Sequence, residues 1–287
     1  MAQNLQSETI QALSRVKKSD YRHHLFIESY GVKVGITANY AEAVQAVRKT
    51  LEEYLPDCFV EIEESETPHN FRLRWNPSGI DSFYKNGKKL YGAELREKLL
   101  ENLASEIRRT VAEFAVGHVF IHSGVVSWKG KAIVMPAKSL GGKTSLTAAL
   151  IKRGALYYSD EYAILDADGF LYPFPKKLSV RETSDHRQQV LRPVEQFGGR
   201  AAAEKTRVGM FLLTRYKPNG GWNPKTLTPA QGILEIIKHT VPIRTNPGFV
   251  LEVLNRVVSE AVVVKSNRGD VSKSVDSILD FFERNCL

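Results

Sequence analysis

A short apolar run, a loop of small residues and a helical segment follow one another at residues 131–154, KAIVMPAKSLGGKTSLTAALIKRG. The apolar run is typical of a buried strand, and Gly154 is placed to end the helix. A second apolar run begins at residue 155 and predicts another strand. This strand–loop–helix–strand order predicts the βαβ unit of an α/β nucleotide-binding fold.

The loop at residues 137–144 matches the Walker A pattern G-x-x-x-x-G-K-[ST] at every fixed position except the first, where Ala137 replaces glycine. In such a loop, backbone N–H groups and the helix N-terminus bind an oligophosphate. Lys143 is expected to reach the β- and γ-phosphates, and the Thr144 hydroxyl to ligate Mg²⁺. A glycine-rich helix start without a ligand is the alternative. The candidate nucleotide-binding residues are Ala137, Lys138, Ser139, Leu140, Gly141, Gly142, Lys143, Thr144 and Ser145.

An acidic pair, Asp160-Glu161, stands sixteen residues after Thr144, at the end of an apolar run. A carboxylate at that position is suited to binding the metal together with Thr144, and we expect Asp160 to do so. The second carboxylate can take a proton from an attacking hydroxyl. His122 lies upstream in a predicted strand that should neighbour the loop, and a buried histidine of the core is its alternative interpretation.

These segments resemble the catalytic core of the HPr kinase/phosphorylase family and its relatives: IHSGVV around His122, the loop at 137–144, Arg153-Gly154 and the acidic pair occur in the same order. The resemblance implies a P-loop kinase core akin to phosphoenolpyruvate carboxykinase. It also implies Mg²⁺-dependent transfer of the γ-phosphoryl of ATP to a serine hydroxyl of a protein, peptide or small molecule. The catalytic residues would then be His122, Lys143, Asp160 and Glu161. Such kinases are oligomeric, so a homo-oligomer is expected. Glu161 stands where the second acid is normally Asp, and together with Ala137 it favours the alternative of a catalytically weak nucleotide-binding regulator.

Residues 1–115 predict a separate α+β domain that holds or positions the acceptor. Helical spacing marks 41–54, period-two alternation marks 59–64 and 71–75, and Asn86-Gly87 predicts a two-residue hairpin. Leucines and other apolar residues from Leu95 to Phe114 recur every three or four positions and predict a long amphipathic helix. We therefore expect a catalytic domain at 116–287.

The formal net charge of +8 is uneven, because residues 117–287 hold 24 Lys and Arg against 15 Asp and Glu, a net of +9. Ten of these cations fall within 176–217, after the acidic pair. Cations stabilise the charge of a transferring phosphoryl group, and Lys177, Arg181 and Arg215 are the candidate clamp residues. A solvated basic face is the alternative. Nucleic-acid binding is less favoured, since aromatic residues are not interleaved with the basic ones.

Cys58 and Cys286 have no metal-binding or redox spacing and predict free thiols in a reducing compartment. The N-terminal segment lacks the apolar core of a signal peptide, and no run reaches the roughly 18 apolar residues of a membrane span. These features predict a cytoplasmic protein without a membrane partner.

Overall fold

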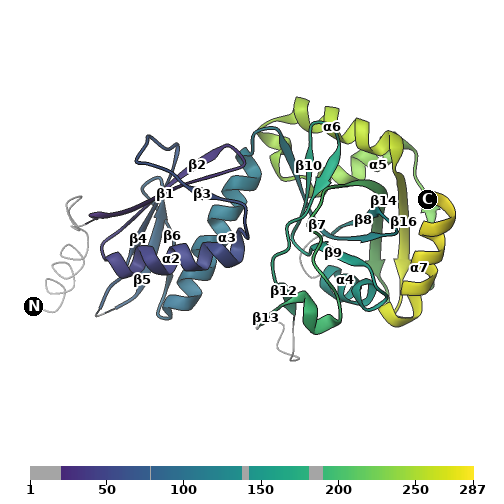
Figure 1. Cartoon of the computed structure of the whole chain (residues 1–287), viewed down its shortest axis with the longest axis horizontal. Coiled ribbons are helices and arrows are strands. Elements are labelled where there is room, and N and C mark those ends of the chain that lie inside the picture. Colours follow the sequence, from purple (N-terminus) through teal and green to yellow (C-terminus); the bar gives the residue numbers. More distant parts are fainter. Residues whose placement is uncertain (1–20, 78, 138–141, 181–189) are drawn as a thin grey trace, which may run out of the picture. The chain divides into compact units, whose positions relative to one another are not determined.

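The computed structural model describes residues 21–77, 79–137, 142–180 and 190–287 (Figure 1). It is a mixed α/β structure with several sheets, which confirms the predicted α/β class. No helix in these ranges is long and apolar enough to span a membrane.

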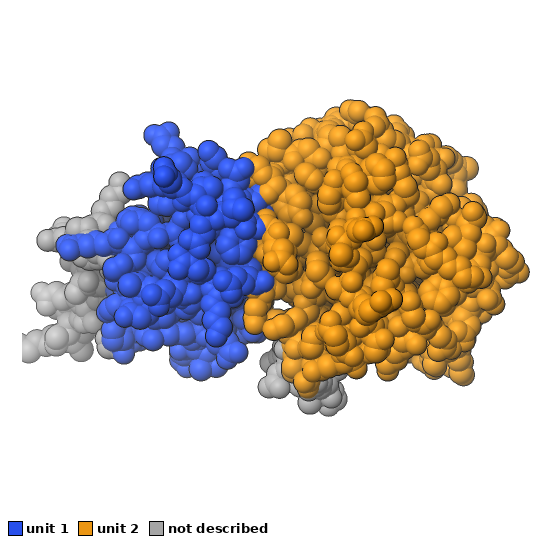
Figure 2. Space-filling model, viewed as in Figure 1, with its two compact units in different colours: residues 1–29, 33–52, 59–107 blue, residues 30–32, 53–58, 108–287 orange. Residues whose placement is uncertain are grey.

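Contacts divide the chain into two compact units (Figure 2). Within the described ranges, unit 1 holds residues up to 29, 33–52 and 59–107, and unit 2 holds 30–32, 53–58 and 108–287. The predicted domain boundary near residue 115, and the role of the first domain, stay predictions.

Unit 1 contains a six-stranded sheet in the order β3-β1-β2-β4-β5-β6. Its strands are β1 (His23–Ser29), β2 (Val32–Ala38), β3 (Val60–Glu61), β4 (His69–Arg74), β5 (Asp81–Lys85) and β6 (Lys88–Ala93). Val32, the first residue of β2, belongs to the short segment 30–32 that is assigned to unit 2. Asn86 and Gly87 have φ values of 47° and 84°, and two successive left-handed residues make the tight hairpin turn that the sequence predicts.

Two helices in the first 114 residues also carry buried apolar side chains. Helix α2 (Ala41–Tyr54) matches the predicted range, and α3 (Arg96–Phe114) runs from unit 1 into unit 2 at residue 108. The predicted apolar face of α3 is buried in its middle, from Leu99 to Val111. Leu95 precedes the helix and is 72% exposed, so the face begins one turn later than its spacing predicts.

Unit 2 contains an eight-stranded sheet with the path β11-β10-β7-β8-β14-β16-β15, and β9 pairs with β7. Its strands are β7 (His118–Trp128), β8 (Lys131–Pro136), β9 (Leu156–Ser159), β10 (Tyr162–Asp166), β11 (Phe170–Tyr172), β14 (Thr206–Tyr216), β15 (Lys225–Thr226) and β16 (Val262–Arg268). A separate pair consists of β12 (Leu178–Val180) and β13 (Val190–Arg192). The helices are α4 (Lys143–Lys152), α5 (Pro229–Ile236), α6 (Pro247–Glu260) and α7 (Val271–Cys286), with 3-10 turns η2 (Val194–Phe197), η3 (Ile237–His239) and η4 (Val241–Arg244).

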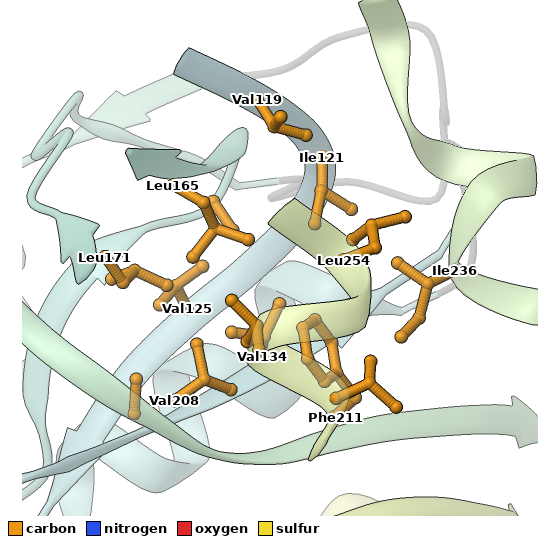
Figure 3. Close-up of a cluster of buried hydrophobic side chains, with 14 of the residues drawn as sticks. Val119, Ile121, Val125, Val134, Leu165, Leu171, Val208, Phe211, Ile236 and Leu254 are labelled. Carbon is orange, nitrogen blue, oxygen red and sulfur yellow. The ribbon is translucent and has the colours of Figure 1, made fainter. Parts of the chain in front are cut away.

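Buried side chains lie on both faces of this sheet because successive strand residues point to opposite sides. Along β14, Phe211 and Leu213 belong to a cluster with α5 and α6 (Figure 3), whereas Met210 and Leu212 belong to a cluster with α4 and α7. The unit is therefore three layers, with helices on each face of the sheet (Figure 1).

The predicted βαβ unit is present as β8–α4–β9, with one difference from the simplest form. Strand β7 lies between β8 and β9 and is antiparallel to both. The strand before the loop and the strand before the acidic pair are therefore separated by the strand that carries His122.

Candidate functional site

Three parallel strands, β8, β14 and β16, end at one edge of the unit 2 sheet, and α4 begins just after β8. The carboxyl edge of such strands is where ligands bind in open α/β sheets. Gly142 caps the N-terminus of α4 with φ 76° and ψ 21°. A Cβ at Gly142 would collide with Nη2 of Arg268. Both the left-handed conformation and this close approach require glycine.

Lys143 is the first residue of α4, and its Nζ donates a hydrogen bond to the Ala137 carbonyl at 2.8 Å. Burial lowers the pKa of Lys143, and the charges of Glu161 and Asp160 oppose that shift. Lys143 therefore lies within electrostatic reach of the acidic pair. Thr144 is half-buried and Ser145 is exposed. The predicted loop residues Lys138, Ser139, Leu140 and Gly141 lie outside the described residues.

The acidic pair occupies a two-residue interruption between β9 and β10, which both pair with β7. Ser159 Oγ accepts hydrogen bonds from the backbone N–H groups of Glu161 and Tyr162, each at 3.0 Å. The N–H of Ser123 on β7 donates to the Glu161 carbonyl at 3.1 Å. An interruption of this kind redirects side chains out of the regular alternation of a strand.

Asp160 is only 6% exposed. Its Oδ1 accepts a hydrogen bond from the Tyr157 hydroxyl at 3.3 Å, and its Oδ2 accepts one from the Ser179 N–H at 3.1 Å. Burial raises the pKa of Asp160, while the Lys176 charge and the Ser179 hydrogen bond oppose the rise. Asp160 is thus held by the fold through both oxygens.

Glu161 is more accessible, with 20% of its side chain exposed, and cations surround it. Its Oε1 lies 3.0 Å from Nη2 of Arg108 and 3.9 Å from Nε2 of His122, and its Oε2 lies 4.0 Å from Nζ of Lys176. Burial by itself would raise the pKa of Glu161, but the Arg108 and Lys176 charges outweigh burial and lower it. Of the two carboxylates, Glu161 is therefore the one that lies near His122, and its charge also acts on the pKa of Lys143.

His122 lies on β7 and pairs with Tyr162 of β10. The next residue, Ser123, pairs with Pro136 of β8 on the other side of β7. Strand β7 pairs with β8, which precedes the loop, and with β9 and β10, which flank the acidic pair. Burial and the nearby Lys143 charge lower the pKa of His122 to about 4. The imidazole is neutral at pH 7 and can act there as a hydrogen-bonding group.

Two buried cations of this cluster were missed by the sequence analysis. Arg108 of α3 is 7% exposed and Lys176 is 3% exposed, and both lie over the Tyr54 ring, at 5.3 and 5.4 Å from its centroid. Arg108 stands four residues from each of two buried alanines, Ala104 and Ala112, so its spacing places it beside the apolar face of α3. Lys176 belongs to the basic segment 176–217, and its position in the sequence does not distinguish it from the other cations there.

The predicted clamp residues have different surroundings. Lys177 is exposed, and its Nζ lies 3.1 Å from Oε1 of Glu53. Lys176, its neighbour, is the cation near Glu161. Arg215 is exposed near the carboxyl end of β14, opposite Asn267 of β16. Arg181 lies outside the described residues.

Among the residues that the structure describes, no group of three or more His, Cys, Asp or Glu side chains is arranged to hold a metal ion. Cys58 and Cys286 are free thiols there, as predicted.

No model of a known protein family matches the sequence, and no curated protein matches it. Among solved structures, the chain is similar to the HPr(Ser) kinase/phosphatase from Coxiella burnetii, with 13% identity and a TM-score of 0.30, over 58% of this chain and 88% of that one. A similarity this distant carries no argument about substrate or mechanism. The functional roles therefore depend on the contacts described above.

Proposed function

We propose that this chain is a Mg²⁺-dependent phosphotransferase that moves the γ-phosphoryl group of ATP to a hydroxyl, with serine as the preferred acceptor. The acceptor serine would belong to a protein, a peptide or a small molecule. The observation that carries the proposal is the position of Glu161. A single strand, β7, separates its turn from β8, which leads to Lys143 and the start of α4.

Lys143 and the N-terminus of α4 supply the positive charge that an oligophosphate needs. In the transfer step, the acceptor oxygen forms a bond to the γ-phosphorus while the bond from that phosphorus to the β,γ-bridging oxygen breaks. ADP leaves with the electron pair of the broken bond. The hydroxyl proton passes to the Glu161 carboxylate, and neutral His122, 3.9 Å from that carboxylate, can orient the hydroxyl.

Glu161 is a better candidate for the proton acceptor than Asp160. Both Asp160 oxygens accept hydrogen bonds from the fold, and its side chain is almost fully buried. Glu161 is the more exposed of the two. We assign Asp160 to the metal, because each of its carboxylate oxygens accepts one hydrogen bond and keeps a second lone pair.

The donor set fits Mg²⁺ bound together with a nucleotide. Mg²⁺ in such sites takes one or two protein oxygens and fills its other positions with phosphates and water. The Thr144 hydroxyl and an Asp160 oxygen would be the protein ligands. When bound, the ion would neutralise charge on the β- and γ-phosphates.

The proposed reaction also needs cations that stabilise the transferred phosphoryl group. Lys176 is better supported than Lys177, because its ammonium group faces Glu161 whereas that of Lys177 faces Glu53. Arg215 stays a candidate clamp residue, since it stands near the carboxyl end of β14. The acceptor-positioning role of residues 1–115 and a homo-oligomeric state also stay predictions.

A catalytically weak nucleotide-binding regulator is the second candidate. The observation that favours it is the ion pairing of Glu161 with Arg108 and Lys176, which lowers the basicity of the carboxylate. Ala137 in place of the first loop glycine points the same way. This candidate would bind ATP without transferring its phosphoryl group.

The test is transfer of label from γ-labelled ATP with Mg²⁺ to free serine, to serine-containing peptides and to cell lysate. Wild-type protein should label at least one acceptor, and Lys143→Ala, Asp160→Asn and Glu161→Gln should each lower the rate at least about a hundredfold, as for loss of a transition-state contact. Lys152→Ala is the matched control, since Lys152 is an exposed lysine in the last turn of the same helix. ATP binding without transfer to any acceptor would favour the regulator, and absence of ATP binding would contradict both.

A further inference from the structure

Arg268 is a buried cation at the carboxyl edge of the unit 2 sheet that the proposed reaction has not yet used. It is the last residue of β16 and is 3% exposed. Its Nη2 donates a hydrogen bond to the Gly142 carbonyl at 3.1 Å, and its Nη1 donates to the Gly269 carbonyl at 3.4 Å. The guanidinium therefore packs directly against the residue that precedes Lys143.

The charge of Arg268 is not matched by an acid. Its buried Nε has no hydrogen-bond partner, and no carboxylate lies within ion-pair distance, among the residues that the structure describes. The Tyr216 ring, with its centroid 5.8 Å from Cζ, supplies a weak cation–π contact. By contrast, Arg108 and Lys176 share the Glu161 carboxylate. Burial without a counter-anion lowers the pKa of Arg268.

A buried charge without a partner is destabilising, because burial removes its hydration and no opposite charge compensates. The fold nevertheless directs this guanidinium to Gly142, where only glycine leaves room for it. The adjacent N-terminus of α4 carries unpaired backbone N–H groups and a partial positive charge. Arg268 therefore contacts the N-cap residue of α4, and Lys143 is the next residue along the chain.

We propose that Arg268 is a phosphate-binding residue, whose guanidinium contacts the oligophosphate of the nucleotide beside Lys143. This inference rests on the proposed function for the identity of the ligand as a nucleoside triphosphate. The anion supplies the counter-charge that Arg268 lacks. The planar guanidinium provides donors in the geometry that phosphate oxygens accept.

The experiment measures binding of tripolyphosphate, ATP and adenosine by calorimetry to wild-type protein, Arg268→Gln and Arg268→Lys. Loss of one charge-assisted contact should weaken tripolyphosphate and ATP about 10- to 100-fold in Arg268→Gln. Arg268→Lys should recover part of that loss, and adenosine binding should not change. Lys265→Gln is the control, because Lys265 is exposed on the same strand and pairs with Glu235.

A second measurement on wild-type protein does not depend on how the variants fold. The Arg268 Nε–H resonance should shift in ¹H–¹⁵N spectra as tripolyphosphate saturates the site. Unchanged triphosphate affinity in a folded Arg268→Gln protein, or an unmoved Nε–H resonance at saturation, would overturn the inference. Binding that depends on Arg268 without any phosphoryl transfer would instead leave the inference standing and overturn the kinase.

Discussion

Nη2 of Arg108 lies 3.0 Å from Oε1 of Glu161, and the arginine side chain is 8% exposed. Helix α3 thereby supplies a charge to the turn between β9 and β10, although 53 positions separate the two residues in the sequence (161 − 108). This ion pair sets the charge state of the carboxylate to which we assign the proton transfer.

Replacing Arg108 with Met should destabilise the protein, because Glu161 would lose its nearest counter-charge. Breaking a buried pair from one side costs about 3–5 kcal/mol, and the remaining Lys176 should keep the loss near the lower value. Urea denaturation measures the change. Lys152→Met, at an exposed position in α4, is the control and should change stability by less than about 0.5 kcal/mol. In a double-mutant cycle, Glu161→Gln should recover part of the loss, and strict additivity of the two substitutions would contradict the coupling.

The two carboxylates should affect stability with opposite dependence on pH. The lowered pKa of Glu161 means that it stabilises the folded state above the ordinary Glu value of 4.5 and that this contribution disappears as the pH falls through its lower folded value. The raised pKa of Asp160 means that wild type gains stability relative to Asp160→Asn as the pH falls. Denaturation of wild type, Glu161→Gln and Asp160→Asn from pH 3 to pH 7 tests both signs. Parallel pH profiles for the two variants would contradict the assignment.

His122 should titrate far below an ordinary histidine. With its pKa lowered to about 4, its protonation destabilises the fold, so the stability that depends on neutral His122 is present above the unfolded value of 6.5 and is lost as the pH falls toward 4. The imidazole resonances of His122, identified by comparison with His122→Gln, report the midpoint directly. A midpoint near 6.5 would show that the ring is solvated rather than held beside Lys143.

Gly142→Ala should lose nucleotide binding and stability together. The residue would adopt a left-handed conformation, at about 1–2 kcal/mol, and its Cβ would displace the Arg268 guanidinium. Thermal denaturation and ATP calorimetry measure the two effects. Gly221→Ala is the control, because no atom lies within 4 Å of a Cβ at that position and its φ is not in the left-handed region. Equal changes in Tm and in ATP affinity for the two variants would contradict the steric role of Gly142.

Local sequence signals predicted much of the fold. The α2 range, the Asn86-Gly87 hairpin and the β8–α4–β9 order depend on neighbouring residues, so composition and periodicity were enough to find them. The insertion of β7 between β8 and β9 could not be found in this way, because strand pairing depends on contacts between segments that are distant in sequence.

The same distinction between local signals and long-range contacts applies to the candidate site. Motif spacing predicts Lys143, Asp160 and Glu161 as candidates, whereas the position of Arg108 next to Glu161 depends on the tertiary fold. Arg268 had an available signal. The alternation of β16 places it on the same face as the buried Val264 and Ser266, and a charged residue in such a register is unusual enough to attract notice.

Strand β7 sets the distance between β8 and β10, which flank the proposed site. Paired strands are about 4.8 Å apart, so the two spacings from β8 across β7 to β10 place Pro136, at the end of β8, about 10 Å from Tyr162, at the start of β10. Backbone hydrogen bonds fix that span, and side-chain substitutions leave it unchanged. If the proposed kinase were adapted to another acceptor, we would therefore expect substitutions in the loops at this edge of the sheet, while the spacing between β8 and β10 stays the same.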